Sequence, residues 1–516
     1  MGKNHVYDKE DVISRLDLCL GKTFGEIDDK GIFDHVQQFD LQKGIVGHVV
    51  EQCIFEYSPN PDKEADLIII EDGKETQTEL KTTGLVIKTS PQKHYEAKEP
   101  MSITGVGIYD IDKQNFYSSH FWGKLEHMLI VYYYYAATHK KVKPYDYKDF
   151  PLKGYEFHYF MPDEKQTLKA DWEIVRDFCA EIVNRHPGER TKKWKDEIKE
   201  DYIENHGCLR RQLSYIDLAP KYPPRFRLKQ STVSMLVSRH FGYKLEQLPG
   251  KYSTINDIDK KCHELTKKFK GKTVTELADL FDIPKTSLKG NETKSISELI
   301  TVRMFGGKSN KLNKVEAFER FGLIAKTIVL TPQGGRTEDM KLYHMDFDEL
   351  VQETITEDDG TVRKIEFSDS QMYSYFTNNE LICIIFEEPE VARGASHKLV
   401  DNKFIGFKRL VFEDSFIEDA VQKLWIDTRR KIKEKTLVDV VKYDNNGSPV
   451  VNRSGGMSSA PNFMKSKDNT VFLRGSGKDS SPSSKTENVN GIKMLPQYVW
   501  IKGSSIVKEL EKTPFL

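Results

Sequence analysis

The sequence has few cysteines, no long apolar run and almost no net charge. Six cysteines are scattered over 516 residues and none belongs to a C-x-x-C pair, which argues against a disulfide framework and against a zinc site. The longest apolar run, MLIVYYYYAA, is too short to span a bilayer. No N-terminal segment resembles a signal peptide. We therefore expect a cytoplasmic protein without a membrane partner.

A net charge of −1 gives no overall signal for nucleic-acid binding, so local clusters of charge matter more. Residues 208–230 contain six basic residues and one acid, with aromatic residues between them. Residues 451–503 contain eight basic residues and three acids in a stretch rich in Ser, Gly and Asn. Either cluster is a solvated face or a surface for nucleic acid. The interleaved aromatic residues favour nucleic-acid binding for the first cluster.

The segment EADLIIIEDGKETQTELK combines an apolar run with a turn signal. Residues 65–70 predict a buried strand, and the Asp-Gly pair at 72–73 is a strong signal for a two-residue hairpin. If this pair forms the tip, Asp66 and Glu79 are equally far from it and face each other. Lys81 shares the face of Glu79, because side chains two residues apart in a strand point the same way.

Two carboxylates that face each other across a hairpin repel unless a cation neutralises them. Mg²⁺ is a hard cation that prefers oxygen ligands, which Asp66, Glu79 and the carbonyl group of Leu80 can supply. Lys81 is suited to orient or deprotonate an attacking water and to offset charge in the transition state. The segment therefore predicts a metal-dependent nuclease, with ordinary surface charges near a turn as the alternative.

A predicted helix precedes this hairpin. The segment KGIVGHVVEQCIF, residues 43–55, repeats apolar residues at i, i+4 spacing, which is typical of an amphipathic or buried helix. Glu51 lies among these apolar residues near the end of the helix. It is either a third carboxylate of the site or a surface glutamate at the edge of the apolar stripe.

Three blocks of the sequence resemble the MutH family of DNA endonucleases, and more closely its two-domain type II restriction endonucleases that cleave at GATC. KGIVGHVVEQCIF is similar to the family's Gly-x-x-Gly-x-x-x-Glu helix. Asp66 followed by ELKTT is similar to its Asp…Glu-x-Lys-Thr core. PPRFRLKQSTVSMLVSRHF, residues 223–241, is similar to its Pro-Arg-x-Phe-x-Leu-Lys segment, which leads into a helix.

This resemblance implies roles for individual residues. Asp66, Glu79 and Lys81 would form the catalytic core, Glu51 would assist metal binding or set the polarity of the site, and Lys124 would lie near the scissile phosphate. The segment that reaches DNA would contribute Arg225, Arg227 and Lys229. Arginine and lysine are the side chains that most often contact guanine.

The second half of the chain repeats the first half in weakened form. GKTFGEIDDKGIF at residue 21 is echoed by GKTVTELADLFDI at residue 271, and ELKTT is echoed by IAKTI. Lys326 then corresponds to the lysine of the core, whereas Ile324 and Ala317 replace its glutamate and aspartate. A site without carboxylates cannot hold Mg²⁺ in this way, so we expect no cleavage by the second half.

Basic and aromatic residues remain in the second half. Arg474, Lys478 and Lys502, together with the aromatic pair Tyr498 and Trp500, predict that DNA binding is retained. The resemblance implies that this half binds a second GATC site and activates the first half. A duplicated scaffold that serves only stability is the alternative.

We therefore predict an α/β fold with two homologous restriction-endonuclease-like domains of the PD-(D/E)xK, MutH-like type, each a mixed β-sheet flanked by helices. Residues 1–250 would form the catalytic domain. Residues 251–516 would form a DNA-binding allosteric effector domain that lacks the catalytic acids.

The predicted activity is Mg²⁺-dependent hydrolysis of double-stranded DNA at GATC, which leaves 5′-phosphates. A palindromic site needs two active sites, so dimerisation or DNA looping on binding is expected. One alternative is a GATC-nicking endonuclease of DNA repair. The other is a non-catalytic protein that binds GATC or senses its methylation.

Overall fold

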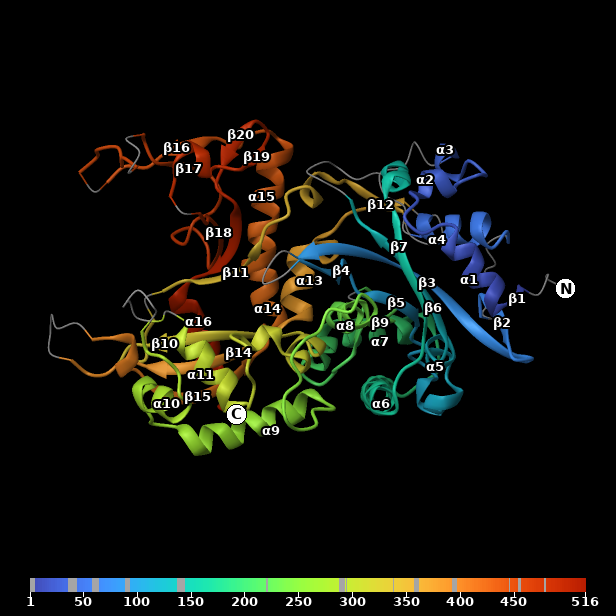
Figure 1. Ribbon diagram of the computed structural model, residues 1–516, viewed down its shortest axis with the longest axis horizontal. Helices are drawn as coiled ribbons and strands as arrows, with labels where there is room; N and C mark the ends of the chain where they lie inside the picture. Colours follow the sequence, from blue (N-terminus) through green and yellow to red (C-terminus); the bar gives the residue numbers. More distant parts are fainter. Residues whose placement is uncertain are drawn as a thin grey trace.

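Both halves of the chain are built from mixed sheets with helices on their faces (Figure 1). The computed structural model describes residues 5–35, 44–57, 65–88, 93–136, 144–219, 221–286, 293, 295–336, 338–356, 362–391, 397–444, 446–452, 456–477 and 479–516. In Figure 1 the first half of the chain lies on the right of the view and most of the second half on the left. The predicted α/β class is thus confirmed.

The first half contains eight α-helices and nine strands within its described residues. The helices are α1 (Lys9–Asp17), α2 (Phe24–Ile27), α3 (Ile32–His35), α4 (Ile45–Val49), α5 (His120–Leu125), α6 (Pro162–Arg185), α7 (Lys192–Asn205) and α8 (Gln230–His240). The strands are β1 (Val6–Asp8), β2 (Leu67–Glu71), β3 (Lys74–Lys88), β4 (His94–Ala97), β5 (Met101–Gly105), β6 (Met128–Tyr134), β7 (Leu152–His158), β8 (Ile216–Leu218) and β9 (Arg225–Leu228).

The second half continues with further helices and strands. The helices are α9 (Ile255–Phe269), α10 (Val274–Leu280), α11 (Ile296–Met304), α12 (Glu316–Arg320), α13 (Gln371–Asn378), α14 (Asp414–Phe416), α15 (Lys423–Lys433) and α16 (Gly503–Lys512). The strands are β10 (Leu323–Leu330), β11 (Met340–His344), β12 (Thr354–Thr356), β13 (Val362–Lys364), β14 (Glu380–Glu387), β15 (Lys403–Leu410), β16 (Asp439–Val441), β17 (Ser459–Pro461), β18 (Val471–Gly475), β19 (Glu487–Val489), β20 (Ile492–Met494) and β21 (Gln497–Ile501). None of the helices in the described part of the chain is both long enough and apolar enough to cross a bilayer.

The main sheet of the first half has the order β1-β2-β3-β6-β7, with β4 beside β3. The pairs β1–β2 and β3–β6 are parallel, and β2–β3, β3–β4 and β6–β7 are antiparallel. A second sheet of order β5-β9-β8 is antiparallel throughout.

The β2–β3 hairpin has the register predicted from the sequence. Leu67 pairs with Thr78, so the next position outward brings Asp66 beside Glu79. Both residues of the tip, 72–73, have positive φ, which is the conformation of a type I′ turn and explains the preference for Asp-Gly there. The predicted hairpin is therefore confirmed.

The two faces of the main sheet pack against different helices. Leu80 and Leu129 belong to a core cluster with residues of α1, α2 and α4. Met128 and Ile130 belong to another cluster, with residues of α5, α6 and α8. Met128 is the β6 partner of Glu79, and Ile130 is the partner of the lysine at 81. Glu79 and Lys81 therefore lie on the face of the sheet that packs against α5.

The predicted helix at residues 43–55 is present, but it changes form in the middle. Gly44 has a φ of 83° and precedes α4. After Val49 the helix continues as a π-helical turn, Val50–Ile54, which contains Glu51. Single π-turns are frequent at functional sites, because they turn a side chain away from the direction that a regular helix would give it.

The second half repeats part of the strand order of the first half. Strand β10 is parallel to β14, and β14 is antiparallel to β15, as in β3-β6-β7. The sheet of order β11-β21-β18 has a helix, α16, directly after β21, as α8 follows β9. The hairpin is not repeated, because the short helix α12 stands before β10 where β2 stands before β3. Ala317, aligned with the first aspartate, lies in this helix.

One of the buried core clusters contains residues of both halves. Lys251 lies between α8 and α9, in a stretch without helix or strand. One core cluster contains Trp172 and Leu236 from the first half as well as Ile258 and Phe407 from the second. Burial of apolar surface is the main stabilising term in folding, so contacts across this boundary contribute to the stability of both halves.

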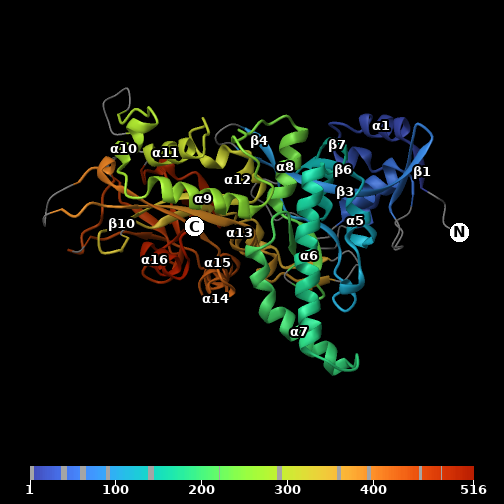
Figure 2. The ribbon, with the colours of Figure 1, turned by 90° about the horizontal axis from the view of Figure 1, so that it is seen from below.

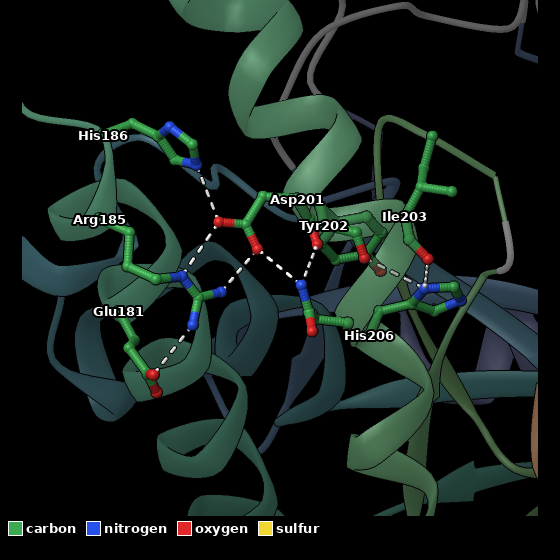
Figure 3. A network of polar contacts seen from close by, with 8 residues as sticks. Glu181, Arg185, His186, Asp201, Tyr202, Ile203 and His206 are labelled. Atoms are coloured by element: carbon green, nitrogen blue, oxygen red, sulfur yellow. Dashed lines mark hydrogen bonds and ion pairs between the residues drawn. The ribbon is translucent and has the colours of Figure 1, made fainter.

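The helices α6 and α7 extend away from the rest of the chain (Figure 2). The carboxylate of Asp201 on α7 joins them, since it accepts two hydrogen bonds from Arg185, of 3.0 and 2.6 Å, and one of 2.8 Å from His186 (Figure 3). Asn205 donates to the same carboxylate at 2.8 Å. This network fixes the end of α6 to the middle of α7.

Replacement of Asp171 by alanine is expected to destabilise the protein. This buried carboxylate on α6 accepts hydrogen bonds from the main-chain amides of Ser214, Tyr215 and Ile216. Each buried donor that loses its acceptor costs about 1–3 kcal/mol, so with three donors the free energy of unfolding should fall by at least about 3 kcal/mol. Urea unfolding followed by circular dichroism measures this change. The exposed Asp177 on the same helix is the control, and its alanine variant should differ from wild type by less than about 0.5 kcal/mol.

Candidate active site

Glu79 is the centre of a charged cluster at the start of the β3–β6 pairing. Its side chain is buried, with 4% of the residue exposed. Its Oε1 accepts a hydrogen bond of 2.8 Å from Lys81 Nζ, and its Oε2 accepts one of 2.6 Å from Lys124 Nζ. Strand β3 supplies the first lysine, and the last turn of α5 supplies the second. The structure thus brings together three of the residues predicted for the site.

Asp66 lies beside this cluster, directly before β2. Its Oδ2 accepts a hydrogen bond of 2.9 Å from the main-chain amide of Leu80, and its own carbonyl accepts one of 3.0 Å from His5 Nδ1. Burial and the negative charge of Glu79 raise the pKa of Asp66, although Lys81 opposes them. The carboxylate is therefore fixed in position at a place where its negative charge is unfavourable.

Glu51 approaches the same cluster from the π-turn. Burial raises its pKa to about 7, and the charge of Asp66 contributes more to this rise than the charge of Glu79. Its Oε2 is buried and has no hydrogen-bond partner among the residues that the structure describes. Three carboxylates thus act on one another electrostatically, and the structure leaves an oxygen of one of them without a donor.

Tyr57 also belongs to the site, although no pattern in the sequence indicated it. Its ring stacks on His5 with the ring centroids 4.0 Å apart. Burial raises the pKa of its phenol, and the charges of Glu51 and Asp66 raise it further. The phenol is thus a neutral group at the edge of the acid cluster. A single tyrosine after a helix is part of no sequence motif from which a role in the site could be predicted.

The oxygen ligands that this site offers fit a hard divalent cation. Asp66, Glu79 and Glu51 offer carboxylate oxygens, and the buried oxygen of Glu51 without a donor is the kind of atom that a cation would satisfy. In the described ranges no group of three or more His, Cys, Asp and Glu side chains is arranged as a metal site. Both oxygens of Glu79 are instead bound by lysines.

The basic segment predicted to reach DNA is partly engaged inside the protein. Arg225 is exposed on β9 and donates to Ser102. Arg227 donates to both oxygens of Asp217, at 3.0 and 2.6 Å. Lys229 is 4% exposed and donates to a main-chain carbonyl at 2.6 Å. In this conformation Arg225 is the most exposed of the three.

Two of the residues predicted to bind DNA in the second half, Arg474 and Lys502, lie on the β11-β21-β18 sheet or next to it. Arg474 pairs with Asp339 at 2.7 Å, and its guanidinium lies 5.0 Å from the ring centroid of Trp500. Lys502 is exposed directly before α16. Lys478 lies outside the described residues. Arg474 and Lys502 are therefore on the protein surface.

Comparisons with known proteins agree with the resemblance expected from the sequence. Residues 55–171 match the family model described as the DNA mismatch repair enzyme MutH. The matched segment contains Asp66, Glu79, Lys81 and Lys124. The chain is also 22% identical over 470 residues to the type II restriction enzyme Sau3AI of Staphylococcus aureus, a similarity that covers 85% of this chain and 89% of that enzyme.

Proposed function

We propose that this chain, a site-specific deoxyribonuclease of the MutH family, is a type II restriction endonuclease that cleaves both strands of DNA at GATC and depends on Mg²⁺. The observation that carries the proposal is the buried Glu79, held between Lys81 and Lys124 beside Asp66. A carboxylate pair with two lysines is suited to phosphodiester hydrolysis, because it provides both metal ligands and cations for the reacting phosphate.

The mechanism assigns a role to each residue of the cluster. Asp66, Glu79 and the carbonyl group of Leu80 would hold the metal, and Glu51 would add negative charge to the site. Bound Mg²⁺ would supply Lewis-acid activation of the phosphate and of a water molecule. Lys81 and Lys124, which donate to Glu79 in the structure, would act on the substrate. Lys81 would orient the attacking water, and Lys124 would contact the scissile phosphate. Hydrolysis leaves a 5′-phosphate.

DNA contacts extend the site beyond the cluster. Arg225 is placed to contact DNA first, since it is exposed. Arg227 and Lys229 would follow once they exchange their internal partners, such as Asp217, for phosphates or bases. Two active sites are needed for the two strands of a palindrome, so two chains would assemble on DNA.

The second half would act as an effector. In this proposal residues 251–516 are a homologous domain that binds a second GATC site, with Arg474, Lys478 and Lys502 as contacts, and activates residues 1–250. The repeated strand order of β10-β14-β15 supports the homology. The loss of the acids, with Ile324 at the glutamate position, supports a binding role without cleavage.

Plasmid cleavage distinguishes this proposal from its two alternatives. Unmethylated plasmid should become linear with Mg²⁺ and stay supercoiled with EDTA. Nicked circles as the final product would indicate the nicking repair endonuclease. Binding to GATC without cleavage under any condition would indicate the methylation-sensing or binding protein. The similarity to Sau3AI along both halves favours the restriction enzyme over a single-domain nicking enzyme.

A further inference from the structure

A cluster of cations occupies the position in the second half that corresponds to the active site of the first. Lys326 on β10 pairs with Cys383 on β14, as Lys81 pairs with Ile130 between the corresponding strands of the first half. Paired residues of neighbouring strands have side chains on the same face. Lys326 therefore occupies the position on the β10-β14-β15 sheet that Lys81 occupies on the main sheet of the first half.

Two more cations reach this position from the segment that follows β10. Lys326 Nζ donates to the main-chain carbonyl of Lys341 at 2.7 Å. Lys341 Nζ donates to Ser476 at 2.9 Å and lies 3.4 Å from the ring centroid of Tyr498. Arg336 lies in the glycine-containing turn between β10 and β11, and its positive charge acts on the thiol of Cys383, as that of Lys326 does.

These cations have no carboxylate partner among the described residues. No ion pair joins Lys326, Arg336 or Lys341 to an acid there, whereas both lysines of the first site are paired with Glu79. Burial lowers the pKa of Lys326 to about 8, and it also lowers the pKa of Arg336 and of Lys341. An uncompensated buried charge is unfavourable, so an anion would stabilise this arrangement.

Arg336 identifies the kind of anion. Its Nη1 is buried and has no hydrogen-bond partner among the described residues, while its Nε donates to the carbonyl of Glu338 at 2.7 Å. The charges of Glu338 and Asp339 act on this guanidinium without forming an ion pair with it, and the charge of Lys341 acts on Lys326. A guanidinium group with a free donor is suited to a phosphate oxygen. The aromatic ring of Tyr498 and the cation of Arg474 continue the same surface along β18 and β21.

We propose that Lys326, Arg336 and Lys341 form a metal-independent seat for a backbone phosphate of a second DNA duplex. The seat rests on the proposed effector function of residues 251–516 and gives it a chemical basis. In the first half, carboxylates would bind a metal ion together with the phosphate. In the second half these carboxylates are absent, and basic side chains alone would bind the phosphate. The second site can therefore hold DNA without cutting it.

Binding of DNA at different salt concentrations tests this seat. The full chain is titrated in EDTA with a labelled GATC duplex at several KCl concentrations, and the slope of log K against log [salt] is measured for the second duplex bound. Each phosphate contact removed lowers the magnitude of this slope by about 0.9. Lys326→Met and Arg336→Met should each show this decrease, and Lys326→Arg should keep the wild-type slope.

Lys403→Met is the matched control, because Lys403 is an exposed lysine of the same half at the start of β15. Its slope should equal that of wild type. Unchanged slopes in both Lys326→Met and Arg336→Met would overturn the seat, as would a wild-type chain that takes up only one duplex. Plasmid cleavage by the wild-type chain tests the proposed function separately. If the wild-type chain cleaves plasmid but the slopes of Lys326→Met and Arg336→Met are unchanged, only the seat is rejected.

Discussion

Glu79→Gln is expected to lower the rate of DNA cleavage by about 10³-fold, because loss of a metal-binding carboxylate removes several kcal/mol of transition-state stabilisation. The amide keeps the shape of the side chain but provides neither the charge for the metal nor the partner that positions Lys81 and Lys124. Cleavage of a labelled GATC duplex under single-turnover conditions measures the rate. Binding of the duplex in EDTA should remain.

Glu75→Gln is the matched control for this variant. Glu75 is an exposed glutamate on the same strand and the same face, four residues before Glu79. Its replacement should leave the cleavage rate unchanged, which would show that loss of a negative charge from β3 is not itself damaging. A Glu79→Gln variant that cleaves at the wild-type rate would remove the proposed site.

Deletion of residues 251–516 should produce a poorly folded chain and not merely a less active enzyme. Helix α9 supplies Ile258 to the core cluster that contains Trp172 and Leu236 of the first half. Thr167 also donates to the carbonyl of Ser253 at 2.8 Å. Exposing this apolar surface costs about 25 cal/mol for each Å², and a loss of several kcal/mol lowers Tm by about 10 °C or more.

Thermal unfolding of the purified fragment measures this loss. Co-expression of residues 1–250 and 251–516 as separate chains is the control, because the shared core should bring the two pieces together and restore the cleavage activity. A fragment of residues 1–250 with the Tm and the cleavage rate of the full chain would contradict both the shared core and the effector role.

Local patterns in the sequence were sufficient to predict the hairpin and its acids. The Asp-Gly pair predicts a two-residue turn, and the position of the turn sets which residues of the two strands face each other. Asp66 and Glu79 are equally far from this turn, so their approach could be predicted. The placement of Lys124 needed a family resemblance, because nothing in its own segment indicates which carboxylate it meets. The structure adds that it binds the second oxygen of Glu79.

Features that depend on tertiary packing could not be predicted in this way. The burial of Lys229 and the pairing of Arg227 with Asp217 arise from contacts between segments that the sequence does not relate. Tyr57 enters the site only because the chain after the π-turn passes the acids. In the second half the sequence repeat aligned Ala317 with the first aspartate, but it did not indicate that this residue lies in a helix, α12.

Sequencing of the DNA ends shows whether this chain cleaves at GATC in a reaction that needs Mg²⁺ and Glu79. Unmethylated plasmid is incubated with the wild-type chain and with Glu79→Gln, each with Mg²⁺ and with EDTA, and all new ends are sequenced. We expect ends at GATC on both strands, with 5′-phosphates, for the wild-type chain with Mg²⁺ only. Ends at other sequences, or the same ends from Glu79→Gln or in EDTA, would contradict it.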